Sequence, residues 1–320
     1  MRALLILVLA LMPNMTHAQV SYPAKQVRVV VPQPAGGGYD TITRVFAAKL
    51  QEYWGHAVLV ENRPGGNAII GTDYVAKAAP DGYTFIMGGI GPHAINPALF
   101  PKLPYDAVRD FIPVVSVAAA PNLLVVNPSL PVMTAQELAG LLKRSQARPM
   151  SYGSNAVGSS THLAAEMFLQ LIGAKAVHVP YKGSAPMVTA LLGGQVEVAF
   201  MNIIDILVHV NAGKVRALAT AATGRSPLLP DLPTISEAGF PGAESSAWFG
   251  IFVPAGTPQE IVMKLNGDFN RAIKDPDVRG RLSQNGMELF GGTPEQFGEF
   301  QRAEIAKWTR VVKEANVRAD

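Results

Sequence analysis

The stretch VRVVVPQPAGGGYD, residues 27–40, joins a valine-rich run to three consecutive glycines. The valines favour a β-strand at 27–31. The segment 40–55, DTITRVFAAKLQEYWG, has its apolar side chains at helical spacing and Gly55 at a position that can end the helix. Glycine loses the most conformational freedom on folding, so the glycine run needs an unusual backbone or a close approach by another group. We interpret it as a strand-to-helix turn, and by itself it does not decide between a plain turn and a binding site.

The alternation of strands and helices continues along the chain. Further strands are expected at 57–61 and 83–88, and the short connections predict parallel pairing with the first strand. A second alternation contains strands at 122–127, 150–154, 176–181, 196–202 and 215–222, with helices at 161–172 and 185–192. The pattern predicts an α/β protein made of two units, each with its own parallel sheet.

Three helices have recognisable starts. A threonine precedes a Glu or Gln by three residues at Thr134, Thr257 and Thr293, which is the spacing of a capping box. Proline follows Thr257 and Thr293 directly, a residue favoured at the first helical position. We therefore expect helices to open at these three points.

The length of 320 residues predicts more than one domain, because single hydrophobic cores rarely serve so long a chain. A proline-rich segment follows residue 225, and the apolar run WFGIFVP at 248–254 then returns to the first unit. We expect domain 1 to contain residues 19–120 and 245–320, and domain 2 residues 121–244. The two connecting segments, near 120 and 245, would form a hinge over a cleft.

Residues 1–18 have the features of a signal peptide: one early positive charge, an apolar run and a small residue, Ala18, at the expected cleavage site. The apolar run is shorter than the roughly 20 residues that span a membrane. We therefore expect export to the periplasm with cleavage near Ala18. Without Arg2, 26 basic residues face 24 acidic ones, a balance that argues against nucleic-acid or anionic-membrane binding.

The sequence carries little catalytic or metal-binding chemistry. It has no cysteine, and its six histidines stand singly, so we expect no disulfide, no metal and no cofactor, and interpret each histidine as a structural residue with satisfied hydrogen bonds. There is no G-x-S-x-G elbow, HExxH or P-loop, and GGIGPH at 88–93 matches a dinucleotide fingerprint poorly. A triad assembled in space would leave no such pattern. We expect a binding protein and not an enzyme.

A second loop repeats the layout of the opening stretch. The segment GSNAVGSSTH at 153–162 follows a predicted strand and opens a predicted helix. Helix N-termini have unpaired N–H groups and a positive dipole end, so they bind carboxylate or phosphate without a charged side chain. The alternative is that Asp40 and Ser160 or Thr161 only cap their helices, and one loop can do both.

Ordered motifs along nearly the whole chain resemble the Bug family, the extracytoplasmic solute receptors of tripartite tricarboxylate transport systems. The most telling are VVVPQPAGGGYD, ENRPGG, YGSNAVGSSTHLAAE, HVPYKGSAP, LLGGQVEVAF and WFGIFVPAGTP. The resemblance implies a two-domain type II periplasmic binding protein with its ligand cleft between the domains, a two-segment hinge and closure on a small carboxylate. It also implies a monomer that delivers its ligand to a membrane permease of a large and a small integral subunit. A ligand sensor that feeds a signalling partner is the first alternative function, and an enzyme acting on a carboxylate is the second.

In the family the carboxylate is held largely by main-chain amides and small hydroxyls from two loops. Carried over by position, the ligand-binding residues are Gln33, Gly36, Gly37, Gly38, Tyr39, Asp40, Ser154, Asn155, Ser159, Ser160, Thr161, Met201 and Asn202.

This chain departs from the family pattern at positions that bear on the ligand. Gln33 stands where Phe is usual, Tyr39 where Thr is usual and Met201 where Asp is usual. Loss of the acid at 201 removes a partner for an ammonium group, and the Tyr39 ring offers apolar area beside a hydroxyl. We expect an aromatic carboxylate or a long dicarboxylate first and a citrate-like acid second. The alternative is that Tyr39 faces solvent and Met201 packs in the core.

Overall fold

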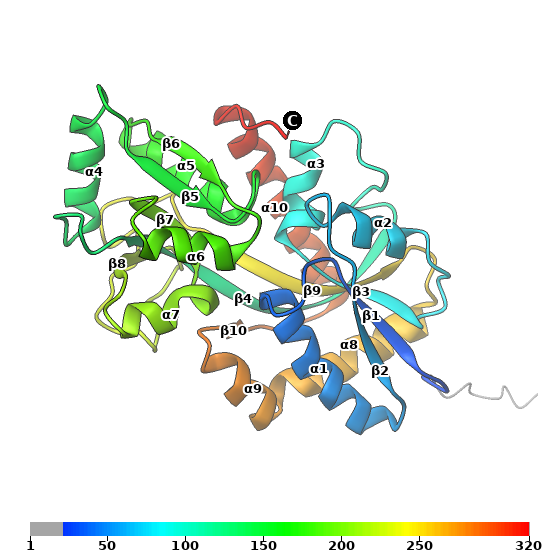
Figure 1. Ribbon diagram of the computed structural model, residues 1–320. Coiled ribbons are helices and arrows are strands. Elements are labelled where there is room, and N and C mark those ends of the chain that lie inside the picture. Colours follow the sequence, from blue (N-terminus) through cyan, green and yellow to red (C-terminus); the bar gives the residue numbers. More distant parts are fainter. Residues whose placement is uncertain (1–21, 320) are drawn as a thin grey trace, which may run out of the picture.

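The computed structural model describes residues 22–319. The predicted signal peptide at 1–18 lies outside the described residues. Within them, no helix combines the length and the apolar character needed to cross a membrane. The strands fall into two groups that share the long strand β4, Phe111–Val126 (Figure 1). The other long strand, β9, Ser246–Pro254, pairs with β4 in the first group.

The first group, sheet A, has the strand order β2-β1-β3-β9-β4, with β10 paired to β4. Its other strands are β1 Val27–Val31, β2 Val58–Asn62, β3 Thr84–Gly89 and β10 Glu288–Leu289. Strands β1, β2 and β3 are parallel, whereas β9 is antiparallel to both β3 and β4. The return of the chain to the first unit at 248–254 is confirmed, because β9 pairs with β3.

The second group, sheet B, has the order β6-β5-β7-β4-β8 and contains only the end of β4. Its other strands are β5 Ser151–Ser154, β6 Val177–Pro180, β7 Val198–Asn202 and β8 Arg216–Thr220. Strands β7 and β8 are antiparallel to β4. The prediction of one parallel sheet for each unit was therefore wrong, because both sheets are mixed. In sheet A the antiparallel strand β9 comes from the C-terminal part of the chain, and in sheet B the end of β4 is antiparallel to β7 and β8.

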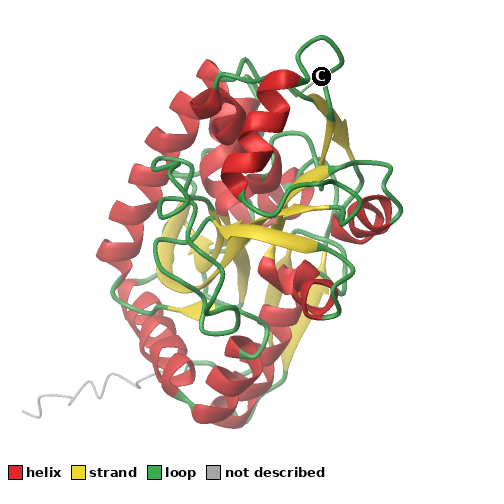
Figure 2. Cartoon of the chain, turned by 90° about the vertical axis from the view of Figure 1, so that its left-hand side faces the viewer, coloured by secondary structure: helices red, strands yellow, loops and turns green. Residues whose placement is uncertain are grey.

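Helices cover both faces of each sheet (Figure 2). On sheet A, α1 packs with α8 and α9 on one face, while η1, α3 and α10 pack together on the other, where α2 also lies. Their bounds are α1 Gly38–Trp54, α2 Ile69–Ala76, the π-helix η1 Gly91–Ile95, α3 Asn96–Leu99, α8 Gln259–Lys274, α9 Pro276–Ser283 and α10 Pro294–Glu314. On sheet B the helices are α4 Ala135–Arg144, α5 Ser160–Ile172, α6 Ser184–Leu192 and α7 Ile203–Asn211.

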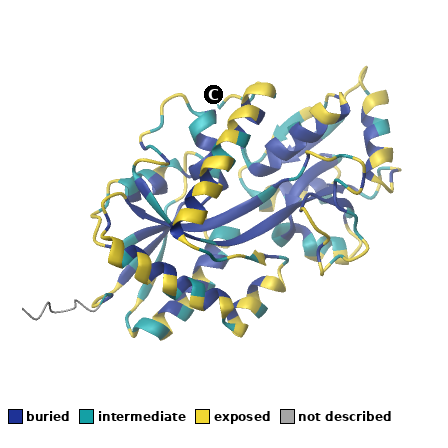
Figure 3. Cartoon of the chain, turned by 180° about the vertical axis from the view of Figure 1, so that it is seen from behind, coloured by how far each residue is buried: buried dark blue, intermediate teal, exposed yellow. Residues whose placement is uncertain are grey.

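Two apolar cores hold these layers together. The larger core continues from sheet A to the α6 and α7 side of sheet B, and the smaller one lies between sheet B and the helices α4 and α5. The buried strands run through the middle of the molecule, and exposed residues gather on the outer faces of the helices (Figure 3).

A helix opens at each of the three predicted points, and two of the three predicted caps are confirmed. Thr134 accepts the Glu137 N–H, and Thr293 forms a complete capping box with Gln296. The predicted cap at Thr257 was wrong, because α8 begins at Gln259 with Pro258 as its N-cap, and the Thr257 hydroxyl donates instead to the Pro254 carbonyl at 2.7 Å.

His93 has no hydrogen-bond partner for either ring nitrogen among the described residues, contrary to the expectation of satisfied histidines. Its ring is fully buried and stacks on Phe252, with centroids 3.9 Å apart. Burial lowers the pKa of His93 from 6.5 to about 3. Between these two values the unfolded chain takes up a proton that the folded protein does not, so the free energy of unfolding falls as the pH falls.

Replacing His93 with a non-titrating residue therefore reduces the acid sensitivity of the fold. Between about pH 7.5 and about pH 5, the loss in free energy of unfolding should be about 2 kcal/mol smaller in His93→Phe and His93→Gln than in the wild type. Urea unfolding at the two pH values measures this difference, with His56→Gln at a partly exposed turn as the control. An unchanged loss in both His93 variants would contradict the assignment.

Candidate functional site

The candidate site lies where the carboxyl ends of the parallel strands of both sheets lead into helices. In α/β sheets this edge is where ligands bind, because loops and helix N-termini converge there. The connections from sheet A are β1 to α1, β2 to α2 and β3 to η1, and those from sheet B are β5 to α5, β6 to α6 and β7 to α7.

Loops of the two sheets touch each other at this edge. Asn67, before α2, donates through Nδ2 to the Val157 carbonyl before α5 at 3.1 Å. Leu99 packs so closely on Gly158 that a Cβ there would lie 2.0 Å from Leu99 Cδ2. Asn67 and Ala68 both have left-handed backbones, with φ of 51° and 72°. Such strain in residues other than glycine persists only where the surroundings enforce it, and it is concentrated at functional sites.

Asp40 organises the loop before α1. Its Oδ2 accepts the Gly36 N–H at 2.9 Å and Arg44 Nε at 2.9 Å, and Arg44 Nη2 lies 2.9 Å from Oδ1. Burial alone would raise the pKa of Asp40, but hydrogen bonds from Arg44, the Gly36 amide and Asn62 hold that pKa below its usual value. The Asp40 carboxylate thus ties α1 to the loop that precedes it, which agrees with the alternative that Asp40 has a structural role.

The three glycines have different requirements. Gly36 has a φ of +82°, in the left-handed region that favours glycine, whereas Gly37 is extended and Gly38 begins α1. A Cβ on Gly38 would meet only ordinary contacts, at 3.7 Å from Phe249 and 3.8 Å from Ile204 of α7. Thr41 is the first residue of α1 whose N–H bonds to the preceding turn, through the Gly37 carbonyl. Among the described residues, the N–H groups of Gly38, Tyr39 and Asp40 have no acceptor.

Gln33 and Tyr39 flank these glycines. The Gln33 carbonyl accepts Asn62 Nδ2 at 3.1 Å, and its side chain is half-buried. The Tyr39 ring packs edge to face on Phe249, with ring centroids 4.7 Å apart, and the Tyr39 hydroxyl points inward, next to Gly89. Burial raises the pKa of Tyr39 above its usual value. The Tyr39 hydroxyl is therefore buried, although the residue as a whole is only half-buried.

The side chains of the second loop bond mainly to one another. The Thr161 hydroxyl accepts the Asn155 N–H at 3.2 Å, donates to Asn155 Oδ1 at 3.0 Å and lies 2.9 Å from Ser159 Oγ. Ser159 also caps α5 by accepting the His162 N–H. The N–H groups of Ser160 and Thr161 have no acceptor in the part of the chain that the structure describes. This loop therefore leaves main-chain donors free while its hydroxyls fix the backbone.

Ser154, Met201 and Asn202 are all buried. Ser154 donates to the Ala156 carbonyl and forms a hydrogen bond with His178, so it fixes the start of the loop from the buried side. Met201 is 1% exposed and belongs to the larger core, the packing role that the sequence left open. Asn202 ends β7, and its Oδ1 is buried without a hydrogen-bond partner among the described residues. A buried unpaired amide at this edge is an acceptor available to a ligand or a water molecule.

Sequence reasoning missed two residues of this region. The sequence around Asn67 gave no signal of its role, because that role depends on the approach of the second loop. Asp205, in the first turn of α7, accepts a hydrogen bond from Ser184 of α6 at 2.7 Å. Burial raises the pKa of Asp205 in spite of that bond. An acidic side chain, Asp205, is therefore present beside this edge, although position 201 has Met where the family that the sequence resembles usually has Asp.

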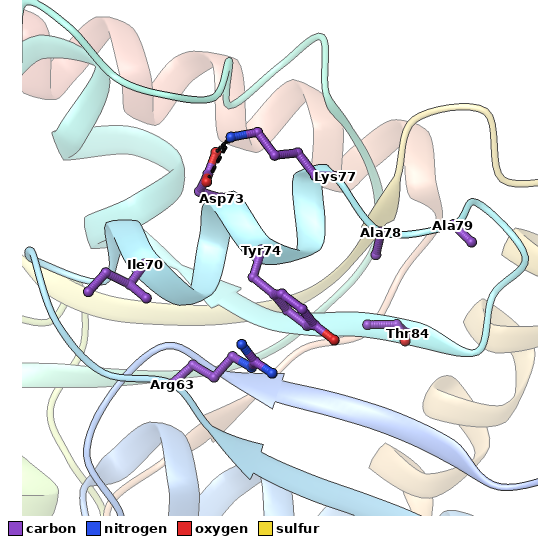
Figure 4. A pocket seen from close by; sticks show the side chains of 8 residues that line it. All are labelled: Arg63, Ile70, Asp73, Tyr74, Lys77, Ala78, Ala79 and Thr84. Atoms are coloured by element: carbon purple, nitrogen blue, oxygen red, sulfur yellow. Dashed lines mark hydrogen bonds and ion pairs between the residues drawn. The ribbon is translucent and has the colours of Figure 1, made fainter.

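A surface hollow of about 430 Å³ lies along α2, apart from the predicted ligand-binding residues, none of which lines it (Figure 4). Arg63 lies over the Tyr74 ring at 3.6 Å, and Lys77 pairs with Asp73. The charged groups shown there are already paired, so the hollow does not compete with the loops as a carboxylate site.

Residues 42–317 match the family model TctC, described as the tripartite tricarboxylate transporter family receptor. The chain is 38% identical to protein BugT of Bordetella pertussis, over 93% of this chain and 91% of that protein. It is similar to the solved structure of Rhodopseudomonas palustris Rpa4515 with adipate, with 40% identity and a TM-score of 0.86, over 93% of this chain and 99% of that one. It is also similar to MatC from the same organism with bound malate, with 34% identity and a TM-score of 0.82, over 91% of this chain and 100% of that one.

These matches confirm the α/β periplasmic-binding-protein fold expected from the sequence, and they identify a family of receptors and not of enzymes. The chain belongs to the tripartite tricarboxylate transporter family of receptors, which are periplasmic solute-binding proteins.

Proposed function

We propose that this receptor captures a small carboxylate between the loops before α1 and α5. The observation that carries the proposal is the set of free N–H groups at the starts of these helices, Gly38 to Asp40 on one and Ser160 to Thr161 on the other. Each helix start is also the positive end of a helix dipole, which favours an anion. A dicarboxylate satisfies both helix starts at once.

The proposed motion separates residues 19–120 with 245–320 from residues 121–244. The support lies in β4, which pairs with β9 as far as Pro121 and with β7 and β8 from Asn122 onward. At this crossing Asn122 Nδ2 donates to Ser245 Oγ at 2.7 Å in a buried position. Rotation about these two strands opens or closes the loops on the ligand, and only a ligand that binds the closed state better drives closure.

The ligand class that we favour is a long dicarboxylate, followed by an aromatic carboxylate. The solved relative with adipate, at 40% identity, supports the first. The half-buried Tyr39 ring against Phe249 supplies apolar surface for the body of such a ligand. In this proposal the signal peptide directs the protein to the periplasm, and the closed monomer delivers its ligand to a membrane permease of a large and a small integral subunit.

A thermal-shift screen of the mature protein tests the ligand class. A ligand that binds only the folded state raises the melting temperature, so adipate and terephthalate should each raise it and citrate less. Adipamide, which has the same chain without charge, is the matched control and should cause no shift. Binding of glutamate with none of adipate or terephthalate would contradict the ligand class, and no shift with any carboxylate would contradict the function.

Removing one main-chain donor tests the role of the amides directly. Gly38 is the first residue of α1 and Gly37 is extended, so Gly38→Pro fits the backbone while removing an N–H. Losing a hydrogen bond to a charged group should weaken carboxylate binding roughly tenfold or more. Gly38→Ala also adds a Cβ but keeps the N–H, and calorimetry should find its affinity within about threefold of the wild type. Equal affinities in the two variants would exclude the Gly38 amide as a ligand donor.

The contact between Asn67 and Val157 should stabilise the closed arrangement. Asn67→Ala removes this hydrogen bond, so calorimetry should find carboxylate affinity reduced by roughly three- to tenfold. Asn285→Ala removes a comparable bond to the Arg281 carbonyl on an exposed helix end and serves as the control. Unchanged affinity in Asn67→Ala would show that the bond contributes nothing to closure.

A further inference from the structure

Two histidines hold the two ends of the loop between β5 and α5. His162 Nδ1 accepts the N–H of Gly158 at 2.9 Å, near the end of the loop. His178 Nε2 lies 2.6 Å from Ser154 Oγ, at the start of the loop. Since the single hydroxyl proton of Ser154 is donated to Ala156, His178 is the donor in this pair. The two imidazoles therefore act on the loop as one acceptor and one donor.

The two rings support each other. His162 and His178 stack face to face, with centroids 3.7 Å apart and an angle of 6° between their planes. Tyr152 lies opposite His178 in the pairing of β5 with β6, and its ring is 5.0 Å from His178. The Tyr152 hydroxyl in turn donates to Glu166, one turn along α5 from His162. This cluster fixes the ring orientations from three elements, α5, β5 and β6.

Both imidazoles are neutral at neutral pH. Burial lowers the pKa of His162 to about 3, with a further contribution from His178, and burial lowers the pKa of His178 to about 4. A neutral His162 that accepts at Nδ1 carries its proton on Nε2, which faces Glu166 Oε1 at 3.9 Å. The hydrogen bond to Gly158 requires this form of the ring.

Gly158 is buried, has a φ of +69° and packs against Leu99, the last residue of α3. Its N–H would lose its only acceptor in the described structure without the His162 nitrogen, and a buried unpaired N–H is costly. The loop would then change shape directly before Ser160 and Thr161, whose amides are free.

We propose that His162 and His178 are positioning residues that set the β5–α5 loop in its ligand-binding shape. This inference rests on the proposed carboxylate function for its effect on affinity, while its effect on the loop itself is independent of any ligand.

Paired variants of each histidine test the proposal with adipate as the probe. His162→Phe keeps an aromatic ring to stack but has no acceptor, and should bind about tenfold more weakly than the wild type. His162→Asn places an amide oxygen close to the position of Nδ1 and should recover to within about threefold. His178→Phe and His178→Gln form the equivalent pair for the donor to Ser154. His56→Phe, at the turn before β2, is the control and should bind like the wild type.

A ligand-free measurement separates failure of this inference from failure of the proposed function. Amide hydrogen exchange followed by NMR should show Gly158 protected in the wild type and His162→Asn, and exchanging about tenfold faster in His162→Phe. The wild-type His162 ring should show its proton on Nε2. Equal Gly158 protection in folded His162→Phe would overturn the proposal, as would His162→Asn behaving like His162→Phe. If adipate does not bind the wild type, the exchange result still decides the positioning role.

Discussion

The antiparallel pairing of β4 with β9 is the constraint on which the rest of the structure depends. The pairing runs from Phe111 with Pro254 to Pro121 with Ser246, and only beyond it does β4 enter sheet B. Because the same strand belongs to both sheets, the position of one sheet restricts the other. This arrangement directs loops from both sheets toward each other, so that Asn67 reaches Val157. The carboxylate site that we propose, made by loops of both sheets, depends on this shared strand.

The two helix starts use different means to keep main-chain donors free. Before α1, a carboxylate, Asp40, accepts the Gly36 amide and so fixes the turn. Before α5, hydroxyls and an imidazole do the same work, with Thr161 and Ser159 bonding to each other and His162 accepting from Gly158. In both cases the polar side chains are used on the loop itself. The groups left over are peptide N–H groups, the donors that suit an anion at a helix dipole.

The sequence predicted the elements with a clear local signal. The strand at 27–31 has the predicted bounds, and Gly55 ends α1 in the left-handed conformation. The first half of β4 was missed, because prolines and alanines in FIPVVSVAAAP weaken the strand pattern and its pairing partner, β9, lies far along the chain, from Pro121 with Ser246 to Phe111 with Pro254. The helix α7 was missed although IIDILVHVN has a helical period, with apolar Ile203, Ile206 and Val210 at i, i+3 and i+7.

For the candidate site too, features with a local sequence signal could be predicted, and features that depend on distant contacts could not. The two loops could be predicted, because each follows a strand and opens a helix. The stack of His162 on His178 could not, because it depends on the pairing of β5 with β6 and on the angle at which α5 crosses them. A single histidine in the sequence predicts a residue with satisfied hydrogen bonds, but both ring nitrogens of His93 lack partners among the described residues, because its ring is buried against Phe252.

The recognition by peptide amides that we propose has a consequence for how such a receptor can change its ligand. Most point mutations leave a main-chain N–H in place, so under this proposal the anchor for a carboxylate survives while neighbouring side chains vary. Gln33 and Tyr39, which flank the glycines, are side chains of this kind. Under this proposal, substitution of a few side chains can therefore change which acid is bound, while the main-chain donors continue to bind the carboxylate group.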